Sequence, residues 1–101
     1  MPRYIASYDL KNTTPSPYGP FIEAAEDNGW TVWIKAAEGE WNRLPNTTLI
    51  GDFDDIDAAV SALKQTRTDA SKVINVDIKM PKWIVSERKA SKFVSDETME
   101  D

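Results

Sequence analysis

The chain has 101 residues, of which 41% are apolar, enough for one hydrophobic core and too few for two. It has no histidine and no cysteine, which excludes disulfides, thiolate nucleophiles, a Ser-His-Asp triad and the commonest zinc sites. The formal net charge of −5 argues against sequence-independent nucleic-acid binding, which depends on neutralising phosphates. With no signal-peptide pattern and no apolar run near the ~20 residues of a membrane span, we expect a cytoplasmic protein without a membrane partner.

The N-terminal part predicts a strand, a turn and a helix. Residues 3–9 alternate in the period of two that is typical of a strand. Residues 11–17 contain two prolines and several capping residues, which favour a turn. The helix begins near Pro17 or Pro20 and ends before Gly29, a residue suited to the position after a helix. Its apolar face comprises Phe21, Ala24 and Ala25, with Ile22 beside it.

Two strands separated by an irregular excursion come next. Residues 30–37 return to a period of two, and residues 47–53 form the third predicted strand. Between them, Gly39 interrupts the pattern, and Pro45 discourages a regular central strand.

A second helix is predicted from Asp54, a good N-cap, to about Thr68–Ala70. Its apolar stripe comprises Ile56, Ala59, Val60 and Leu63. The carboxylates Asp52, Asp54, Asp55 and Asp57 gather at its start. Helix capping explains this cluster better than calcium binding, because a calcium loop needs a longer spacing of ligands.

The C-terminal part predicts a fourth strand at Val73–Lys79, with Ile74, Val76 and Ile78 facing inward. After Pro81, residues 82–86 are expected to form a short fifth strand. We expect one domain over residues 1–88 and a charged, flexible tail over residues 89–101.

This order of elements predicts an α+β fold, a ferredoxin-like β-α-β-β-α-β sandwich. Right-handed crossovers favour an antiparallel sheet in the order 4-1-3-2 with both helices on one face. Ile5 and Ser7, with Trp33 as a further candidate, would line the open face. Apolar groups exposed there would indicate a partner, most simply a second copy of the chain.

Asp9 is the candidate for chemistry, because it ends the first strand beside a flexible loop. A carboxylate in that position suits a Mg²⁺ ion that also holds water and a phosphate. The structural alternative is an Asp that begins the turn by accepting hydrogen bonds from nearby backbone N–H groups.

The first-strand segment RYIASYDL, residues 3–10, resembles that of the small CRISPR-associated dimeric nucleases and their VapD-like and SinR-like relatives. These relatives include an antitoxin that cleaves its toxin's messenger RNA. The resemblance implies a ferredoxin-like homodimer joined through the sheet, in which two Asp9 side chains share a divalent metal across the dimer axis. It also implies that residues 82–86 add to the partner's sheet. The family's CRISPR-associated members carry Arg shortly after this Asp, whereas here only Lys11 is nearby.

A basic strip and four tryptophans are further candidates for binding. The strip consists of Lys79, Lys82, Arg88, Lys89 and Lys92, which would contact phosphates or simply form a solvated face that protects a sheet edge. The tail carries four acids from Asp96 onward and could fold back on this strip. The tryptophans Trp30, Trp33, Trp41 and Trp83 are either core or dimer residues or base-stacking platforms, with Trp41 the best candidate for stacking.

Three functions remain open on the sequence. The first is a non-catalytic binding or regulatory dimer whose partner is RNA or another protein. The second is a Mg²⁺-dependent endoribonuclease or endonuclease that uses Asp9 at the dimer axis. The third is a small-molecule sensor, for which no Gly-rich phosphate loop is found. The sequence favours the first.

Overall fold

The computed structural model describes residues 1–99, which form a mixed α+β structure with two helices and antiparallel sheets. In chain order the elements are β1 (Arg3–Asp9), α1 (Tyr18–Asp27), β2 (Trp30–Thr31), β3 (Trp33–Lys35), β4 (Trp41–Arg43), β5 (Thr48–Asp52), α2 (Ile56–Ile74), β6 (Lys82–Glu87) and β7 (Thr98–Met99). Glu100 and Asp101, the last two residues of the expected tail, lie outside the described residues. Neither helix within residues 1–99 is both long and apolar enough to cross a membrane.

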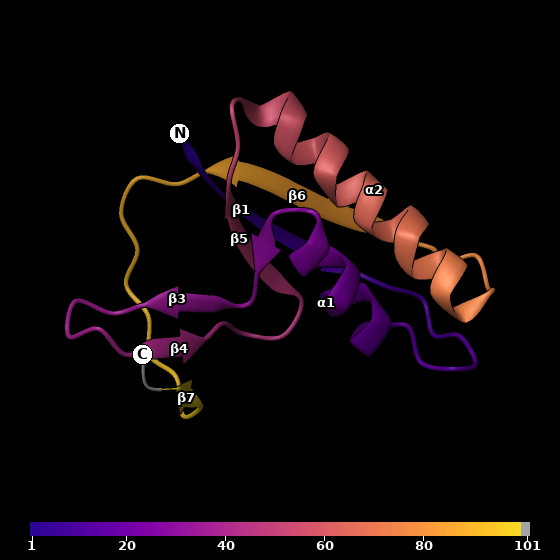
Figure 1. Ribbon diagram of the computed structural model, residues 1–101, viewed down its shortest axis with the longest axis horizontal. Coiled ribbons are helices and arrows are strands. Elements are labelled where there is room, and N and C mark those ends of the chain that lie inside the picture. The colour runs from indigo at the N-terminus through magenta and orange to yellow at the C-terminus, as the bar shows by residue number, and fades with distance from the viewer. Residues whose placement is uncertain (100–101) are drawn as a thin grey trace.

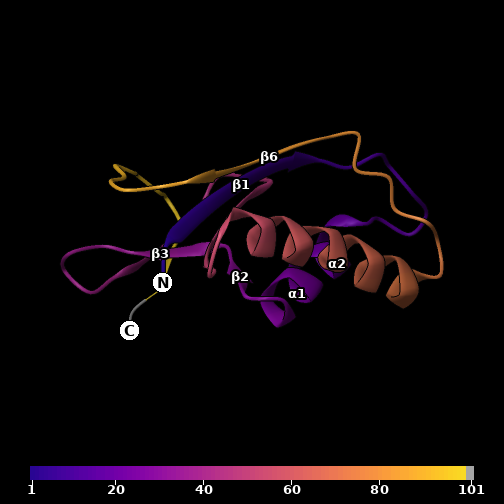
Figure 2. The ribbon, with the colours of Figure 1, turned by 90° about the horizontal axis from the view of Figure 1, so that it is seen from above.

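The main sheet has the strand order β2-β5-β1-β6, and every neighbouring pair is antiparallel. Figures 1 and 2 show α1 and α2 side by side on one face of this sheet. Tyr4, Ala6 and Tyr8 of β1 point toward the helices and are buried, while Ser7 and Asp9 on the opposite face are exposed. The core therefore lies between the sheet and the two helices, and the part of the other face around Ser7 and Asp9 is open to a ligand or a partner.

Helix α1 agrees with the sequence prediction at both ends. Pro17 is its N-cap, and the expected face of Phe21, Ala24 and Ala25 is buried. Gly29 follows the C-cap with φ of +92°, a conformation that glycine adopts at little cost. Asn28 at the C-cap donates through Nδ2 to Asp69 Oδ2 at 3.0 Å, which ties the end of α1 to α2.

Helix α2 begins one residue later and ends later than predicted. Its N-cap is Asp55, not Asp54, and the Asp55 carboxylate accepts a hydrogen bond from the N–H of Ala58 at 2.8 Å. The helix continues past Ala70 because Thr66 and Ala70 are fully buried and extend its apolar face. It stops at Asn75, whose φ of 55° lies in the left-handed region that ends many helices.

The predicted strand at Val73–Lys79 is wrong. Its first residues complete α2, and the rest is an irregular segment held against that helix. Ser71 Oγ accepts from the N–H of Ile78 at 3.0 Å, and Arg67 Nη1 donates to the Ile78 carbonyl at 3.2 Å. Ile78 is nevertheless fully buried, as expected. Its inward position depends on these side-chain bonds and not on a sheet ladder.

The fourth strand of the main sheet is β6, over the residues where a short fifth strand was expected. It pairs with β1 of the same chain from Tyr4↔Glu87 to Asp9↔Lys82. Because β6 is the edge strand of this sheet, pairing with β1 uses only one of its two sides, and the implied addition of residues 82–86 to a partner's sheet stays a prediction.

The second predicted strand is bent into two short strands. Val32 lies at the bend, where its carbonyl accepts from the N–H of Leu44 at 2.8 Å. Strand β2 stays in the main sheet, while β3 pairs with β4, over residues that were expected to form an irregular excursion. Ile34, Leu44 and Ile50 form a second, smaller apolar cluster there, with Ile5 packed against it.

The C-terminal segment runs back to a second, three-stranded sheet with the order β3-β4-β7. After β6 the chain runs toward β4, where β7 adds as an antiparallel strand (Figure 1). The Glu97 carbonyl accepts from the N–H of Arg43 at 2.9 Å. The described end of the tail thus lies along β4. We call residues 88–93, the part of this segment that follows β6, the C-terminal strap.

Candidate functional site

Asp9 lies where the sequence placed it, at the end of β1 on the helix-free face of the main sheet. Lys82, the first residue of β6, is its register partner on that same face. Ser7 and Ile84 form the next pair along the two strands, and the Ile84 side chain is 63% exposed. We call these four residues, Ser7, Asp9, Lys82 and Ile84, the β1–β6 patch.

The turn explanation for Asp9 is not supported by the hydrogen bonds. Within the described part of the chain, the Asp9 carboxylate accepts no hydrogen bond from the turn that follows. That turn is instead stabilised by Thr13, whose Oγ1 donates to the Pro15 carbonyl at 2.6 Å. The carboxylate is exposed and available to a ligand or a second chain.

Asp9 does not belong to a cluster of acidic side chains. Among residues 1–99, no three acidic side chains lie close enough to hold a metal ion together. The neighbouring side chain of the β1–β6 patch is the ammonium of Lys82, which repels a cation. A divalent cation at Asp9 would therefore take its other ligands from water, a bound phosphate or a second chain.

The predicted basic strip is divided in space. Lys79 and Lys82 lie near one end of β6, and Lys79 Nζ is already 2.7 Å from an Asp77 carboxylate oxygen. Arg88, Lys89 and Lys92 follow the other end of β6, about 20 Å away at the rise of an extended strand. The five residues do not form one surface.

At that other end, Arg88 meets Arg3, a residue that was not among the predicted site residues. The N–H of Arg88 donates to the Arg3 carbonyl at 2.8 Å, and Arg3 Nη2 donates to the Lys89 carbonyl at 2.9 Å. Burial, and then the positive charge of Arg3, lower the pKa of Arg88, which the Asp52 carboxylate partly opposes. The alternation of β1 places Arg3 on the face opposite Tyr4, and this was the signal that could have found it.

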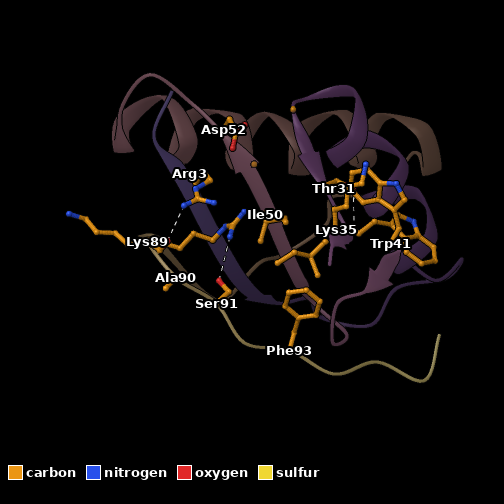
Figure 3. A pocket seen from close by; sticks show the side chains of 15 residues that line it. Arg3, Thr31, Lys35, Trp41, Ile50, Asp52, Lys89, Ala90, Ser91 and Phe93 are labelled. Carbon is orange, nitrogen blue, oxygen red and sulfur yellow. Dashed lines mark hydrogen bonds between the residues drawn. The ribbon is translucent and has the colours of Figure 1, made fainter. Parts of the chain in front are cut away.

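These arginines line a cavity of about 710 Å³ between the main sheet, the β3–β4 hairpin and the C-terminal strap, which we call the strap cavity. Figure 3 shows Arg3, Lys89 and Ser91 on one side of this strap cavity, and Lys35 and Trp41 on the other. Four basic residues and one acidic residue line it, namely Arg3, Lys35, Arg88, Lys89 and Asp52, and of these Lys89 points its side chain away from the cavity in Figure 3.

The tryptophans have different environments. Trp30 is buried in the core beside Phe53, with ring centroids 4.7 Å apart. Trp33 is half-buried and packs against the same core, and Trp83 faces α2, where Lys64 Nζ lies 5.9 Å from its ring. Trp41, the candidate for stacking, is half-buried and lines the strap cavity.

Comparison with known proteins adds no relative. No protein-family model matches the chain, and no curated protein or solved structure shows significant similarity to it.

Proposed function

We propose that the protein is a small binding or regulatory protein without catalysis, which acts as a homodimer. One support is the arrangement of the main sheet. The bent pair β2 and β3 can be counted together as the second strand of the fold, β5 as the third and β6 as the fourth. Counted in this way from the β6 edge, the main sheet has the order 4-1-3-2. That is the order of a ferredoxin-like sandwich, and it agrees with the expected kinship to the CRISPR-associated, VapD-like and SinR-like proteins.

The observation that carries the proposal is the composition of the β1–β6 patch. It combines an exposed apolar residue, Ile84, with an exposed carboxylate, Asp9, and an exposed ammonium, Lys82. In a twofold dimer the same surface is used twice, so a residue that contacts a second residue is contacted by it in return. A patch that holds both charges beside an apolar centre is complementary to itself.

Substitution of Ile84 tests the dimer. We expect Ile84→Glu to raise the dimer dissociation constant at least tenfold, because burial of an isoleucine stabilises a contact by about 1.5–3 kcal/mol. Val73→Glu is the matched control, since Val73 is 71% exposed near the end of α2 and away from the patch. Light scattering during gel filtration gives the mass over a range of concentrations. A monomer at every concentration, or equal effects of the two substitutions, contradicts the proposal.

A second candidate is the Mg²⁺-dependent nuclease acting on RNA or DNA. It is favoured by the exposed Asp9 carboxylate, which has no hydrogen-bond or ion-pair partner within residues 1–99. Two copies would bring two such carboxylates to the dimer axis, and the metal would supply charge stabilisation for phosphodiester cleavage. This candidate therefore requires the same dimer.

Cleavage of labelled RNA and DNA separates the two candidates. The non-catalytic dimer predicts equal, background cleavage with Mg²⁺, with EDTA and with Asp9→Ala. Cleavage that needs Mg²⁺ and is lost in Asp9→Ala, but kept in Asp57→Ala on α2, would establish the nuclease instead.

A further inference from the structure

We propose that the strap cavity binds a small phosphate-bearing ligand with a flat ring, of the nucleoside monophosphate class. The cavity lies at the Arg3 end of the main sheet, whereas the β1–β6 patch lies at the Asp9 end. The inference therefore does not depend on the dimer or on nuclease activity.

The charges of the cavity favour an anion. Arg3 and Arg88 are joined through the backbone at 2.8 Å, so two guanidinium groups come from two adjacent strand ends. Asp52 is the one carboxylate that lines the cavity among the described residues. Arginine guanidinium groups donate in a planar fork that fits the oxygens of a phosphate.

An unused hydrogen-bond donor indicates where the phosphate would bind. Arg88 Nη1 donates to Ser91 Oγ at 3.4 Å, but Arg88 Nε is buried without any partner in the described part of the chain. Buried donors in folded proteins are nearly always satisfied, and an orphaned donor calls for an explanation. A phosphate oxygen at Nε would supply the missing acceptor and balance the neighbouring charge of Arg3.

The remainder of the cavity suits a ring. Phe93 of the strap and Trp41 of β4 both line it, together with the apolar side chain of Ile50 (Figure 3). Aromatic side chains stack on the flat face of any nucleobase. The volume of about 710 Å³ lies within the range of about 300–1,000 Å³ that is usual for small-ligand sites.

Calorimetric titration of the full chain with adenosine 5′-monophosphate tests the inference. Ribose 5-phosphate and adenosine serve as half-ligands, and we expect each to bind at least tenfold more weakly than the whole probe. A short oligonucleotide tests whether the same chemistry is recognised within a nucleic-acid strand. Stronger binding of the oligonucleotide would overturn the free mononucleotide as the ligand.

Two variants with the same change in charge locate the site. We expect Arg88→Gln to weaken binding at least tenfold and Lys72→Gln, on the exposed last turn of α2, to change it less than twofold. Trp41→Ala should reduce binding of the nucleotide but not of ribose 5-phosphate. If Arg88→Gln does not fold, as judged by its melting curve, Arg3→Gln replaces it with an expected loss of at least threefold. No binding of the nucleotide at millimolar concentration, or equal binding by the arginine and Lys72 variants, overturns the inference.

Discussion

Asp9 and Lys82 are register partners across β1 and β6, and both side chains project from the face of the sheet that carries no helix. Residues opposite each other in an antiparallel pair have Cβ atoms about 4.5–5.5 Å apart. The two side chains of opposite charge thus start from neighbouring positions at one end of the sheet, beside the exposed Ile84, without forming an ion pair within residues 1–99. A metal ion, a second chain or a solvated surface would each use these two residues differently.

An exchange of charge between these two residues distinguishes the uses. In a twofold dimer held by contacts between Asp9 of one chain and Lys82 of the other, Asp9→Lys places like charges together. We expect it to weaken the dimer about tenfold, and we expect the double variant Asp9→Lys with Lys82→Asp to restore it. Sedimentation equilibrium at low and high salt measures both effects, which should diminish as salt increases.

If the dimer is instead held by a shared metal ion, the double variant should not restore it. A site that needs carboxylates from Asp9 of both chains would not be rebuilt by the exchange, because the carboxylate would then lie on β6. A double variant that fails to dimerise while Asp9→Lys alone dimerises normally would contradict the ionic contact.

Gly51 is the glycine of the core that should tolerate a side chain least. It pairs in register with Tyr4 on one side and Trp30 on the other, so it makes room between two large aromatic side chains. A Cβ atom there would lie 2.6 Å from the Gly29 carbonyl oxygen and 2.8 Å from Phe53 Cε2. We expect Gly51→Ala to lower the free energy of unfolding by about 1–3 kcal/mol in urea titrations.

Gly19 provides the control for that substitution. It lies in α1, and a Cβ atom added there would meet no heavy atom within 4 Å, so Gly19→Ala should be neutral or slightly stabilising. Equal stability of the two alanine variants would show that the sheet adjusts at Gly51 without cost.

Stability at alkaline pH should depend on Tyr8. Burial raises the pKa of this phenol to about 12 from its ordinary value of 10.0, although the charge of Arg43 opposes the shift. In the unfolded chain the phenol ionises near its ordinary pKa, about two pH units before it does so in the folded protein. The stability that the neutral Tyr8 contributes is therefore complete below about pH 10 and is lost as the pH rises toward 12. Raising the pH from about 8 to about 11.5 should lower the free energy of unfolding by about 2 kcal/mol through Tyr8.

The variant Tyr8→Phe removes this titration and keeps the ring that packs on Phe21, with centroids 4.6 Å apart. We expect its stability to fall less than that of the parent chain between the two pH values, and urea titrations at each pH measure the difference. Equal losses in the two proteins would assign the alkaline sensitivity to other groups.

Local patterns predicted the elements whose signals lie within a few residues. The first strand, the face of α1 and its end at Gly29 follow from periodicity and backbone preference. The start of α2 was predicted to within one residue, because Asp54 and Asp55 are equally good N-caps by residue type and it is Asp55 that accepts the capping hydrogen bond. The mixed α+β class also followed from the order of these elements.

The strand at residues 73–79 could not be rejected locally. Ile74, Val76 and Ile78 alternate as in a strand, but burial of Thr66 and Ala70 extends the helix until Asn75 ends it. The fourth strand of the main sheet is β6, which has no buried residue and therefore no clear alternation. Its place in the sheet depends on pairing with β1, which is distant in the sequence.

The sequence by itself determined the first strand with Asp9 at its end, the first helix, the start of the second helix, and the absence of cysteine and histidine chemistry. Only the tertiary structure decided which charges lie together. It divided the basic strip along β6, paired Asp9 with Lys82, and brought Arg3 beside Arg88 at the mouth of the strap cavity. These pairings join residues more than 70 positions apart, and no periodicity within one segment encodes the register between two strands.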